Sequence, residues 1–316
     1  MLLSSAEAAP VPVVTVFGSI NLDVSYRVSE LPAAGETVLS TGSTSGLGGK
    51  GANQAVAAAR AGARVNFVGA VGADAAGLRL VDVLRRSGVQ TDNVEIISEI
   101  ESGGAMIVVD ERGQNQIVVS SAANAAVTPT SADVAHAVIE ASDVLVVQGE
   151  LAADATVRAV HTAERAGVRV IVNLAPYFDL VPELACADPL VVNEVEASQV
   201  LGVEVDGLES ALALAPRLLK SSRSAVVTIG AEGAVLVTTD EVVHIPAPFV
   251  DSVTDTTGAG DAFVGVLSAA LAGARPLRDA VRSAVAAATL SVQFLGAAER
   301  YPDFSEVLAG GVEVQS

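Results

Sequence analysis

Short runs of apolar, β-branched residues alternate along this chain with longer stretches rich in Ala, Leu and Arg. The runs of strand length are Val13–Phe17, Val65–Val71, Val144–Val147, Val170–Asn173, Leu190–Val192 and Ala225–Ile229. The stretches of helical length are Gly51–Ala61, Ala75–Ser87, Thr156–Ala166, Val195–Leu201, Leu208–Ser221, Ala259–Ala272 and Leu277–Gln293. Central parallel strands are buried on both faces, so their apolar runs are continuous rather than alternating. The pattern therefore predicts an α/β layer fold with a mainly parallel sheet.

Two segments break this rhythm, because they contain strand-like pieces with no helix between them: Leu22–Thr44 and Asn93–Ser120. In the second, Ser102–Asp110 and Gln114–Ser120 flank Glu111-Arg112-Gly113, which is a hairpin signal. Antiparallel strands outside a parallel sheet indicate a small lid or an oligomer surface. The expected division is a large α/β domain, residues 1–21, 45–92 and 121–316, and an inserted β-strand lid, residues 22–44 and 93–120.

Composition and charge exclude several classes of protein. Of the 316 residues, 51% are hydrophobic and 17% are charged, so the chain is not intrinsically disordered. With 18 basic and 37 acidic residues the net charge is −19, and no broad positive field attracts nucleic acid or an anionic membrane. We therefore expect neither as a partner. A single cysteine, Cys186, excludes an intramolecular disulfide framework and a multi-cysteine zinc site.

Targeting and membrane signals are weak in this sequence. The most apolar stretch, Ser283–Ala298, contains Ser, Thr and Gln and is shorter than the ~18–20 residues of a membrane span, so it reads as a buried Ala-rich helix. The first ten residues lack a basic region and an apolar stretch, and they read as a tail rather than as a signal peptide. A cytoplasmic location with reduced Cys186 is the expectation.

The segment Gly46–Gly51 matches the pattern G-x-G-x-x-G, which by itself is a weak signal. A dinucleotide fingerprint needs a strand directly before it and an acidic residue about 20 positions later. Here Ser40–Ser45 reads as a polar loop, and the nearest downstream acid, Asp74, lies beyond the next strand. These departures disfavour a dinucleotide-binding loop, and two further interpretations stay open: a tight loop before a helix, or a site of close ligand approach with Lys50 and Asn53 as donors.

A second small-residue segment, Asp255–Phe263, joins a strand-like region, Val250–Val253, to a long helix that begins near Ala259. Small residues expose successive backbone amides at the positive end of that helix, which is an anion-binding arrangement. Asp261 in the first turn complements the helix dipole in the simplest interpretation. Beside exposed amides, its carboxylate also suits phosphoryl transfer, as the group that accepts the proton of an attacking hydroxyl.

Taken together, the motifs resemble the ribokinase family of sugar kinases, of the phosphofructokinase-B type. They are Gly18-Ser19-Ile20-Asn21-Leu22-Asp23, then Pro32-x-x-Gly35-Glu36-Thr37, then Gly48-Gly49-Lys50-Gly51-Ala52-Asn53-Gln54-Ala55, and Asp255-Thr256-Thr257-Gly258-Ala259-Gly260-Asp261. The similarity runs from about Val14 to Pro302, and the third motif favours the ribokinase branch over the fructose, ketodeoxygluconate and nucleoside branches. It implies a Rossmann-like, ribokinase-type three-layer sandwich with a small β-sheet lid, and a homodimer that forms through the lid.

The resemblance also implies a reaction, the ATP-dependent phosphorylation of D-ribose at its 5-hydroxyl to give ribose 5-phosphate and ADP. Asp261 would be the general base, and the amides of Gly258, Ala259 and Gly260 would form the anion hole. The implied sugar-binding residues are Asn21, Asp23, Gly49, Lys50, Asn53, Glu150 and Asp261. Without the resemblance, Asn21 and Asp23 would be read as turn residues and Glu150 as a solvated loop acid.

For the nucleotide, the resemblance implies contacts from Asn193, Thr228, Gly230, Gly233 and Gly260. Asn193 and Glu196 form an N-x-x-E motif, in which Glu196 would position Mg²⁺ through water, since Mg²⁺ keeps several waters. A plain helix cap, with Asn193 as N-cap and Glu196 at the third helical position, explains the same spacing, and the two roles are compatible. The segment Thr228–Gly233 also reads as a hairpin.

Potassium is implied as an activator. The implied ligands are Asp255 and the carbonyls of Thr257, Ser291, Phe294 and Gly296. One departure puts K⁺ in question: Arg300 stands where the family has a Ser ligand, and its side chain could replace the cation or point away. A second departure, Ser121-Ala122-Ala123-Asn124, affects the loop that faces the sugar.

Other functions remain open on the sequence alone. The nearest is a kinase of another sugar or a nucleoside, such as deoxyribose, fructose or ketodeoxygluconate, on the same scaffold. A more distant one is a sugar-binding protein without turnover, against which the intact Gly258-Ala259-Gly260-Asp261 segment argues.

Overall fold

The computed structural model describes residues 10–179, 182 and 185–309, so residues 1–9 of the expected amino-terminal tail lie outside the described residues. A nine-stranded sheet runs in the order β13-β12-β11-β10-β9-β8-β1-β4-β5. Its strands are β1 (Val13–Phe17), β4 (Arg64–Gly72), β5 (Val89–Ile97), β8 (Val144–Gln148), β9 (Arg169–Asn173), β10 (Leu190–Asn193), β11 (Ala225–Thr228), β12 (Ala234–Val237) and β13 (Val242–Ile245). The pairs from β11 through β5 are parallel, and β12 and β13 add antiparallel strands at one edge. The predicted α/β class with a mainly parallel sheet is confirmed.

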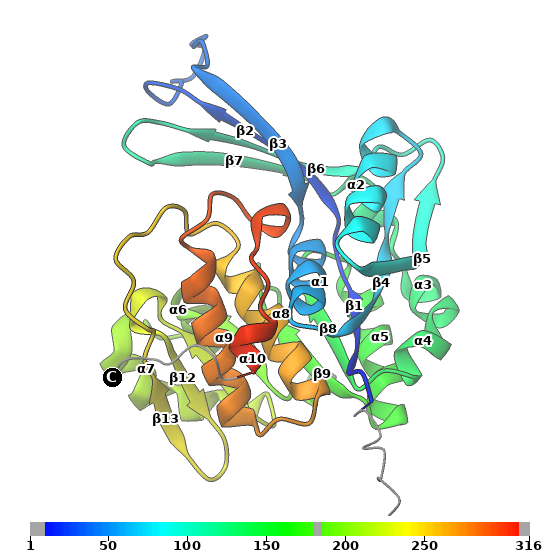
Figure 1. Cartoon of the computed structure of the whole chain (residues 1–316), viewed down its shortest axis with the longest axis vertical. Coiled ribbons are helices and arrows are strands. Elements are labelled where there is room, and N and C mark those ends of the chain that lie inside the picture. Colours follow the sequence, from blue (N-terminus) through cyan, green and yellow to red (C-terminus); the bar gives the residue numbers. More distant parts are fainter. Residues whose placement is uncertain (1–9, 180–181, 183–184, 310–316) are drawn as a thin grey trace, which may run out of the picture.

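Helices cover both faces of this sheet (Figure 1). One face carries α1 (Lys50–Arg60), α2 (Ala75–Arg86), α8 (Ala259–Ala272), α9 (Leu277–Ser291) and α10 (Ser305–Leu308). The other carries α3 (Pro129–Val134), α4 (His136–Glu140), α5 (Ala153–Ala166), α6 (Glu194–Leu201) and α7 (Gly207–Leu214). Because neighbouring residues of a strand point to opposite faces, Val16 packs in the first layer and Phe17 in the second. The result is a three-layer sandwich.

Short 3₁₀ helices complete the connections. They are η1 (Ala122–Ala126), η3 (Ala215–Lys220), η4 (Gly230–Glu232) and η5 (Ala298–Arg300).

A second, four-stranded sheet lies above the carboxyl ends of the large sheet in Figure 1. Its order is β3-β2-β6-β7, from β2 (Asn21–Arg27), β3 (Gly42–Gly48), β6 (Gly103–Val109) and β7 (Asn115–Ser120). β2 and β6 run parallel, and the other two pairs are antiparallel. The predicted hairpin around Glu111-Arg112-Gly113 is therefore confirmed as β6–β7.

Three local predictions were wrong. Ser40–Ser45 was expected to be a loop, but Gly42–Gly48 is an edge strand, whose Ser, Thr and Gly residues are mostly exposed and lack an apolar signature. Residues 93–97, expected in the lid, belong to β5 and pair with β4 in the large sheet. The region Val250–Val253 forms no strand. The division into a large domain and a lid stays a proposal, and the strand pairing moves its expected edges to about 21–48 and 103–120.

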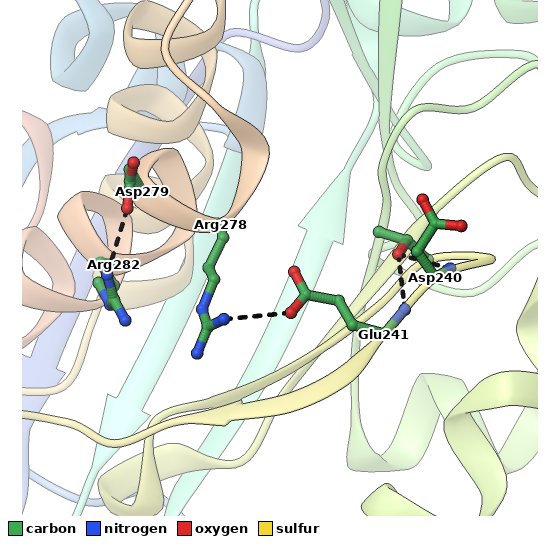
Figure 2. A network of polar contacts seen from close by, with 6 residues as sticks. Asp240, Glu241, Arg278, Asp279 and Arg282 are labelled. Carbon is green, nitrogen blue, oxygen red and sulfur yellow. Dashed lines mark hydrogen bonds and ion pairs between the residues drawn. The ribbon is translucent and has the colours of Figure 1, made fainter.

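The β12–β13 hairpin is linked to α9 by one exposed ion pair, and a second pair lies within the helix, as Figure 2 shows. Arg278 pairs with Glu241 at 3.2 Å, and Arg282 pairs with Asp279 at 3.2 Å within the helix. Exposed pairs of this kind add little stability, about 0–1 kcal/mol each.

α9 ends at Ser291, two residues before the predicted end. Within the described part of the chain, none of the helices is long and apolar enough to cross a membrane.

Candidate active site

A crevice lies where the carboxyl ends of the central strands meet the small sheet. Ser19 follows β1, Gln148 ends β8, Asn173 ends β9 and Asn193 ends β10. The strand order changes direction at β8 and β1, and open α/β sheets bind ligands at such a switch point. The amino end of α8, with Asp261, points into the same region from the helical layer.

Asp261 lies in the first turn of α8 and is buried. Its Oδ2 accepts a hydrogen bond from Asn53 Nδ2 at 2.9 Å, and its Oδ1 accepts one from Gln54 Nε2 at 3.0 Å. Burial raises the pKa of this carboxyl, Lys50 and the two amide donors act in the opposite direction, and the net direction is upward. A buried carboxylate with a raised pKa and oriented donors is suited to proton transfer.

The backbone before Asp261 forms the expected anion site in part. Gly258 adopts the left-handed conformation with φ 78°, and its carbonyl accepts the Tyr301 hydroxyl at 2.6 Å. Among the described residues, the amides of Gly258 and Gly260 have no acceptor, so both can bind an anion. The amide of Ala259 donates to the Thr256 carbonyl at 3.2 Å, and this hydrogen bond would have to break before the amide could bind an anion.

Asp23 and Asn53 supply acceptor oxygens that have no donor. Within the described chain, Asp23 Oδ1 and Asn53 Oδ1 are buried and lack a hydrogen-bond partner. Burial, and then the charges of Glu150 and Asp261, raise the pKa of Asp23 to about 6. The Asp23 carboxyl lies directly over Gly48, where a Cβ would come within 2.0 Å of Asp23 Oδ2. The unpartnered oxygens of Asp23 and Asn53 lie near Asp261 and would accept hydrogen bonds from hydroxyl groups.

The other predicted sugar residues lie at the start of β2, before and at the start of α1, and after β8. Asn21 Oδ1 accepts from Asn124 Nδ2 at 2.8 Å. Glu150 Oε2 accepts from the amide of Lys50 at 2.9 Å and from the Ser19 hydroxyl. Asn21 and Glu150 line a cavity of about 430 Å³ that extends to Val119 on β7 and to Pro176. Gly49 is the residue before α1, in the positive-φ conformation at 87°.

Lys50 connects the sugar and nucleotide sides of the crevice. Burial lowers the pKa of its ammonium, but the charges of Asp261, Glu150 and Glu196 outweigh this and raise it. A cation under the influence of three carboxylates stays protonated, and it is available to a phosphate group that enters the crevice.

On the nucleotide side, Asn193 and Glu196 form the predicted capping box. Asn193 Oδ1 accepts from the amide of Glu196 at 2.8 Å, and Glu196 Oε2 accepts from the amide of Asn193 at 2.9 Å. Burial raises the pKa of Glu196 against the Asn193 hydrogen bond and the Lys50 charge. Thr228–Gly233 forms the predicted hairpin, β11–η4–β12. Thr228 is half-buried, Gly230 is exposed and Gly233 is buried in this turn.

The predicted potassium ligands lie on two adjoining loops. Asp255 Oδ1 accepts from the amide of Thr257 and its Oδ2 from the amide of Gly296, both at 2.9 Å. Burial raises the pKa of Asp255, but these bonds and the Arg27 charge outweigh it and hold the pKa below its usual value. The carbonyl of Ser291 accepts the amide of Phe294 at 3.1 Å. Arg300 is exposed and forms no ion pair with any described residue.

Several polar residues of the crevice have no role in the sequence-based prediction. They are Gln54, Asn124, Gln148, Asn173, Glu299 and Tyr301. Gln148 and Asn173 carried a usable signal, because each is a carboxamide that ends an apolar strand. Asn124 stands in the segment that departs from the family. Glu299 and Tyr301 follow no local pattern, and only the folded chain brings them to the crevice.

Comparisons with known proteins place this geometry in a family. The family model described as pfkB family carbohydrate kinase matches residues 12–303. The ribokinase of Schizosaccharomyces pombe is 36% identical over 308 residues, which cover 93% of this chain and 96% of that protein. The ribokinase of Bacillus subtilis is 39% identical over 295 residues, covering 93% and 97%. The deoxyribokinase of Salmonella typhimurium is 33% identical and covers 93% and 96%.

Solved structures agree with this result. The structure of Arabidopsis thaliana ribokinase complexed with ribose and ATP superimposes with a TM-score of 0.88 at 29% identity, and it covers 95% of this chain and 98% of that one. The likeness therefore extends over both sheets.

Proposed function

The chain belongs to the pfkB family of carbohydrate kinases, and from this premise we propose that it is a ribokinase. It transfers the terminal phosphoryl group of ATP to the 5-hydroxyl of D-ribose and releases ribose 5-phosphate and ADP. Ribokinases cover almost the whole chain at 36–39% identity, and the related structure that holds ribose and ATP has the same fold.

The observation that carries the proposal is the pair of unpartnered acceptors beside Asp261. A buried acceptor without a donor costs about 1–3 kcal/mol. Asp23 Oδ1 and Asn53 Oδ1 would both be satisfied by the hydroxyl groups of a sugar. Asn21 and Glu150, which line the cavity, and Gly49 and Lys50, at the start of α1, complete the proposed sugar site.

Chain groups at the amino end of α8 carry out the proposed chemistry. Asp261 accepts the proton of the attacking 5-hydroxyl. The amides of Gly258 and Gly260, joined by that of Ala259, stabilise the charge that develops on the transferring phosphoryl group. Movement of the small sheet over the sugar would exclude water, which otherwise competes as an acceptor.

The residues of the nucleotide side fit Mg²⁺ and ATP. Among the described residues, no group of three or more His, Cys, Asp or Glu side chains could hold a metal ion, so a divalent ion held by ATP phosphates and water fits better than one held by protein alone. Asn193, Thr228, Gly230 and Gly233 would contact ATP, and Glu196 would hold metal-bound water. Bound Mg²⁺ neutralises phosphate charge. Addition of excess EDTA is expected to abolish turnover, and MgCl₂ is expected to restore it.

The loops around Asp255 fit a monovalent cation, because they combine one carboxylate of lowered pKa with the carbonyls of Thr257, Ser291, Phe294 and Gly296. We propose that K⁺ activates weakly, since Arg300 replaces a hydroxyl ligand. The effect of K⁺ is the gain in thermal stability and in turnover when KCl replaces tetramethylammonium chloride. This gain is expected to be larger in Arg300→Ser than in the wild type. An unchanged KCl response would contradict this role of Arg300.

The substrate assignment is tested by an ADP-release screen across ribose, deoxyribose, fructose, ketodeoxygluconate and nucleosides. Ribose is expected to give the highest kcat/KM. Deoxyribose is the second candidate because deoxyribokinases are 33% identical, and a higher kcat/KM with deoxyribose would replace the proposal. Sugar binding without any ADP release would instead indicate a non-catalytic sugar-binding protein.

Use of ATP and a single buried cysteine support a cytoplasmic location, which cell fractionation tests.

A further inference from the structure

A chain of three buried carboxamides ends on Asp261. Its members are Gln148 on β8, Gln54 on α1 and Asn173 on β9, and their exposed fractions are 2%, 0% and 8%. Gln148 Nε2 donates to Gln54 Oε1 at 2.8 Å, and Gln54 Nε2 donates both to Asn173 Oδ1 at 2.9 Å and to Asp261 Oδ1 at 3.0 Å. Both hydrogens of the Gln54 amide are therefore used.

The direction of this chain is set by a group that can only accept. Asn173 Nδ2 donates to the backbone carbonyl of Val191 at 3.3 Å. A carbonyl has no hydrogen to give, so the amide nitrogen of Asn173 must face it, and the Asn173 oxygen must face Gln54. Gln54 then has to present its nitrogen to Asn173 and, with the second hydrogen, to Asp261.

The opposite end of the chain shows that this direction is kept at a cost. Gln148 Oε1 is buried and, among the described residues, has no partner. It lies against Gly18, where a Cβ would come within 2.2 Å of it. Rotation of the Gln148 amide would place two oxygens opposite each other at Gln54. An unpaired buried acceptor is unfavourable, so its retention indicates that the direction of the hydrogen bonds at Gln54 matters.

We propose that Gln54 is a positioning residue of the proposed kinase reaction, and that Asn173 acts through it to hold an N–H donor on Asp261 Oδ1. This inference rests on the proposed function. With Asn53 on the second oxygen, Asp261 is held in one plane as a carboxylate that accepts two hydrogen bonds, which is the form able to take the sugar proton.

Other titratable groups also face Asp261. They are Lys50 on α1, Glu150 after β8, Asp23 on β2 and the Tyr301 hydroxyl in the carboxyl-terminal segment. Substitution of Gln54 by an uncharged side chain leaves these groups in place. The effect of the lost donor can therefore be separated from theirs.

The test is the pH profile of kcat/KM for ribose in Gln54→Met, which keeps the length of the side chain and removes the donor. Loss of a donor raises the pKa of a carboxylate, so the acidic limb is expected to move to higher pH by about one unit. At neutral pH, kcat is expected to fall about tenfold while the KM for ribose changes little. Gln54→Glu, which adds a negative charge at the same length, is a second variant and is expected to shift the limb further.

Asn173→Ala tests the indirect part of the inference, because Asn173 makes no hydrogen bond to Asp261. Its acidic limb is expected to move in the same direction as that of Gln54→Met. The double variant is expected to match Gln54→Met alone, since both changes remove the same donor. Additive shifts would overturn the claim that Asn173 acts through Gln54.

A matched control is Asn66→Ala, which removes another buried carboxamide, bonded to Thr15 Oγ1 at 3.4 Å and remote from Asp261 in the hydrogen-bond network. It is expected to lower thermal stability without moving the pH limb. An unmoved limb in Gln54→Met would overturn the inference.

A second readout needs no turnover. Asp261→Asn is introduced into the wild type and into Gln54→Met, and the unfolding free energy is measured with and without this change over a range of pH. The pH dependence of the difference reports the pKa of Asp261 in each protein. The same pKa in wild type and Gln54→Met would overturn the role of Gln54. Absence of ADP release by the wild-type protein would instead refute the proposed function, and the two failures are thereby distinguished.

Discussion

The surroundings of four carboxyl groups of the crevice shift their pKa values in different directions. Burial raises the pKa of Asp23, Asp261 and Glu196, because the crevice removes water from them. Asp255 is also partly buried, but two backbone amides bind its oxygens and lower its pKa. The residue type alone does not separate these cases. The balance between burial and donors does: Asp261 and Asp255 each accept two hydrogen bonds, but Asp261 is buried and Asp255 only partly buried.

Asp261→Asn is expected to lower kcat by roughly 10²–10⁴ and to leave ribose affinity almost unchanged, because it removes the proton acceptor but keeps the size of the side chain. Steady-state kinetics and sugar binding by calorimetry measure the two effects. Near-wild-type turnover would contradict the assignment of the base.

Asp23→Asn is expected to stabilise the protein at neutral pH and to weaken sugar binding. The pKa of Asp23 is about 6 in the folded protein against a usual value of 3.8, so the folded state binds the proton more tightly. Stability therefore falls as pH rises from about 4 to 6, and ionisation costs up to about 3 kcal/mol above that range. The asparagine variant avoids this cost, and its Tm is expected to exceed that of the wild type at pH 7.5 but not below about pH 4.

Calorimetric melts at the two pH values measure this difference. Asp82→Asn on the surface of α2 is the control, since its ion pair with Arg86 is exposed and its loss is expected to change stability by less than about 1 kcal/mol. A Tm gain for Asp23→Asn that is equal at both pH values would show that the cause is not ionisation.

At the scale of elements, the close pairing of α1 and α8 assembles the site. Both helices are rich in small buried residues, and at Gly265 the backbone of α8 meets α1 directly. A Cβ on Gly265 would lie 2.4 Å from Ala57 Cβ and 2.5 Å from the Gln54 carbonyl. This approach allows Asn53 and Gln54 on one helix to reach Asp261 on the other.

Gly265→Ala is expected to separate the helices, with a stability loss of about 1–3 kcal/mol from overpacking. Because the donors move away from Asp261, kcat is expected to fall about tenfold or more. Thermal melts and kinetics measure both. Gly273→Ala directly after the same helix is the control, since the nearest atom outside the helix, Pro12 Cγ, would be 3.9 Å from the new Cβ, which is an ordinary contact. Equal behaviour of the two variants would contradict the packing argument.

Elements with strong local patterns are those that the sequence predicts well. The bounds of β1 and α8 are the predicted ones, and most other central strands and long helices differ by one or two residues. β3 was missed and the end of β5 was assigned to the lid, because edge strands are partly exposed, which removes the continuous apolar run. The short helices α3, α4 and α10 were not predicted, since so few turns give no clear periodicity.

At the scale of the whole molecule, the small sheet has two faces with different partners. Asp23 lies on the face toward the crevice. Val24, Met106 and Val118 are in register across β2, β6 and β7, so they share the opposite face. Met106 is 48% and Val118 62% exposed there. We propose that this outer face pairs with a second copy of the chain, because apolar sheet faces and unpaired edge strands favour association.

Val118→Glu is expected to convert a dimer into a monomer, since it places a charge on the proposed interface. Sedimentation equilibrium at micromolar concentration measures the mass. Val134→Glu on α3, at a position 76% exposed and away from the small sheet, is the control and is expected to leave the dimer intact. A monomeric mass for the wild-type protein would contradict the proposal.

The net charge of −19 also acts at this scale. An acidic chain that binds ATP needs positive potential at one place, and the amides before α8, Lys50 and bound Mg²⁺ would provide it locally. Arg300 stays exposed and unpaired with any described carboxylate, so the structure gives no sign that it replaces a cation near Asp255.

By itself, the sequence determined the α/β class, the long helices and buried strands, the motifs of the crevice and the family to which they belong. These follow from neighbours a few positions apart, because apolar periodicity and helix caps are local. Only the tertiary structure decided which donors reach Asp261, since Asn53 and Gln54 lie 208 and 207 positions before it. It also decided the raised pKa of Asp23 and the carboxamide chain from Val191 to Gln54. Burial and hydrogen-bond direction depend on packing between distant segments, which no local pattern contains.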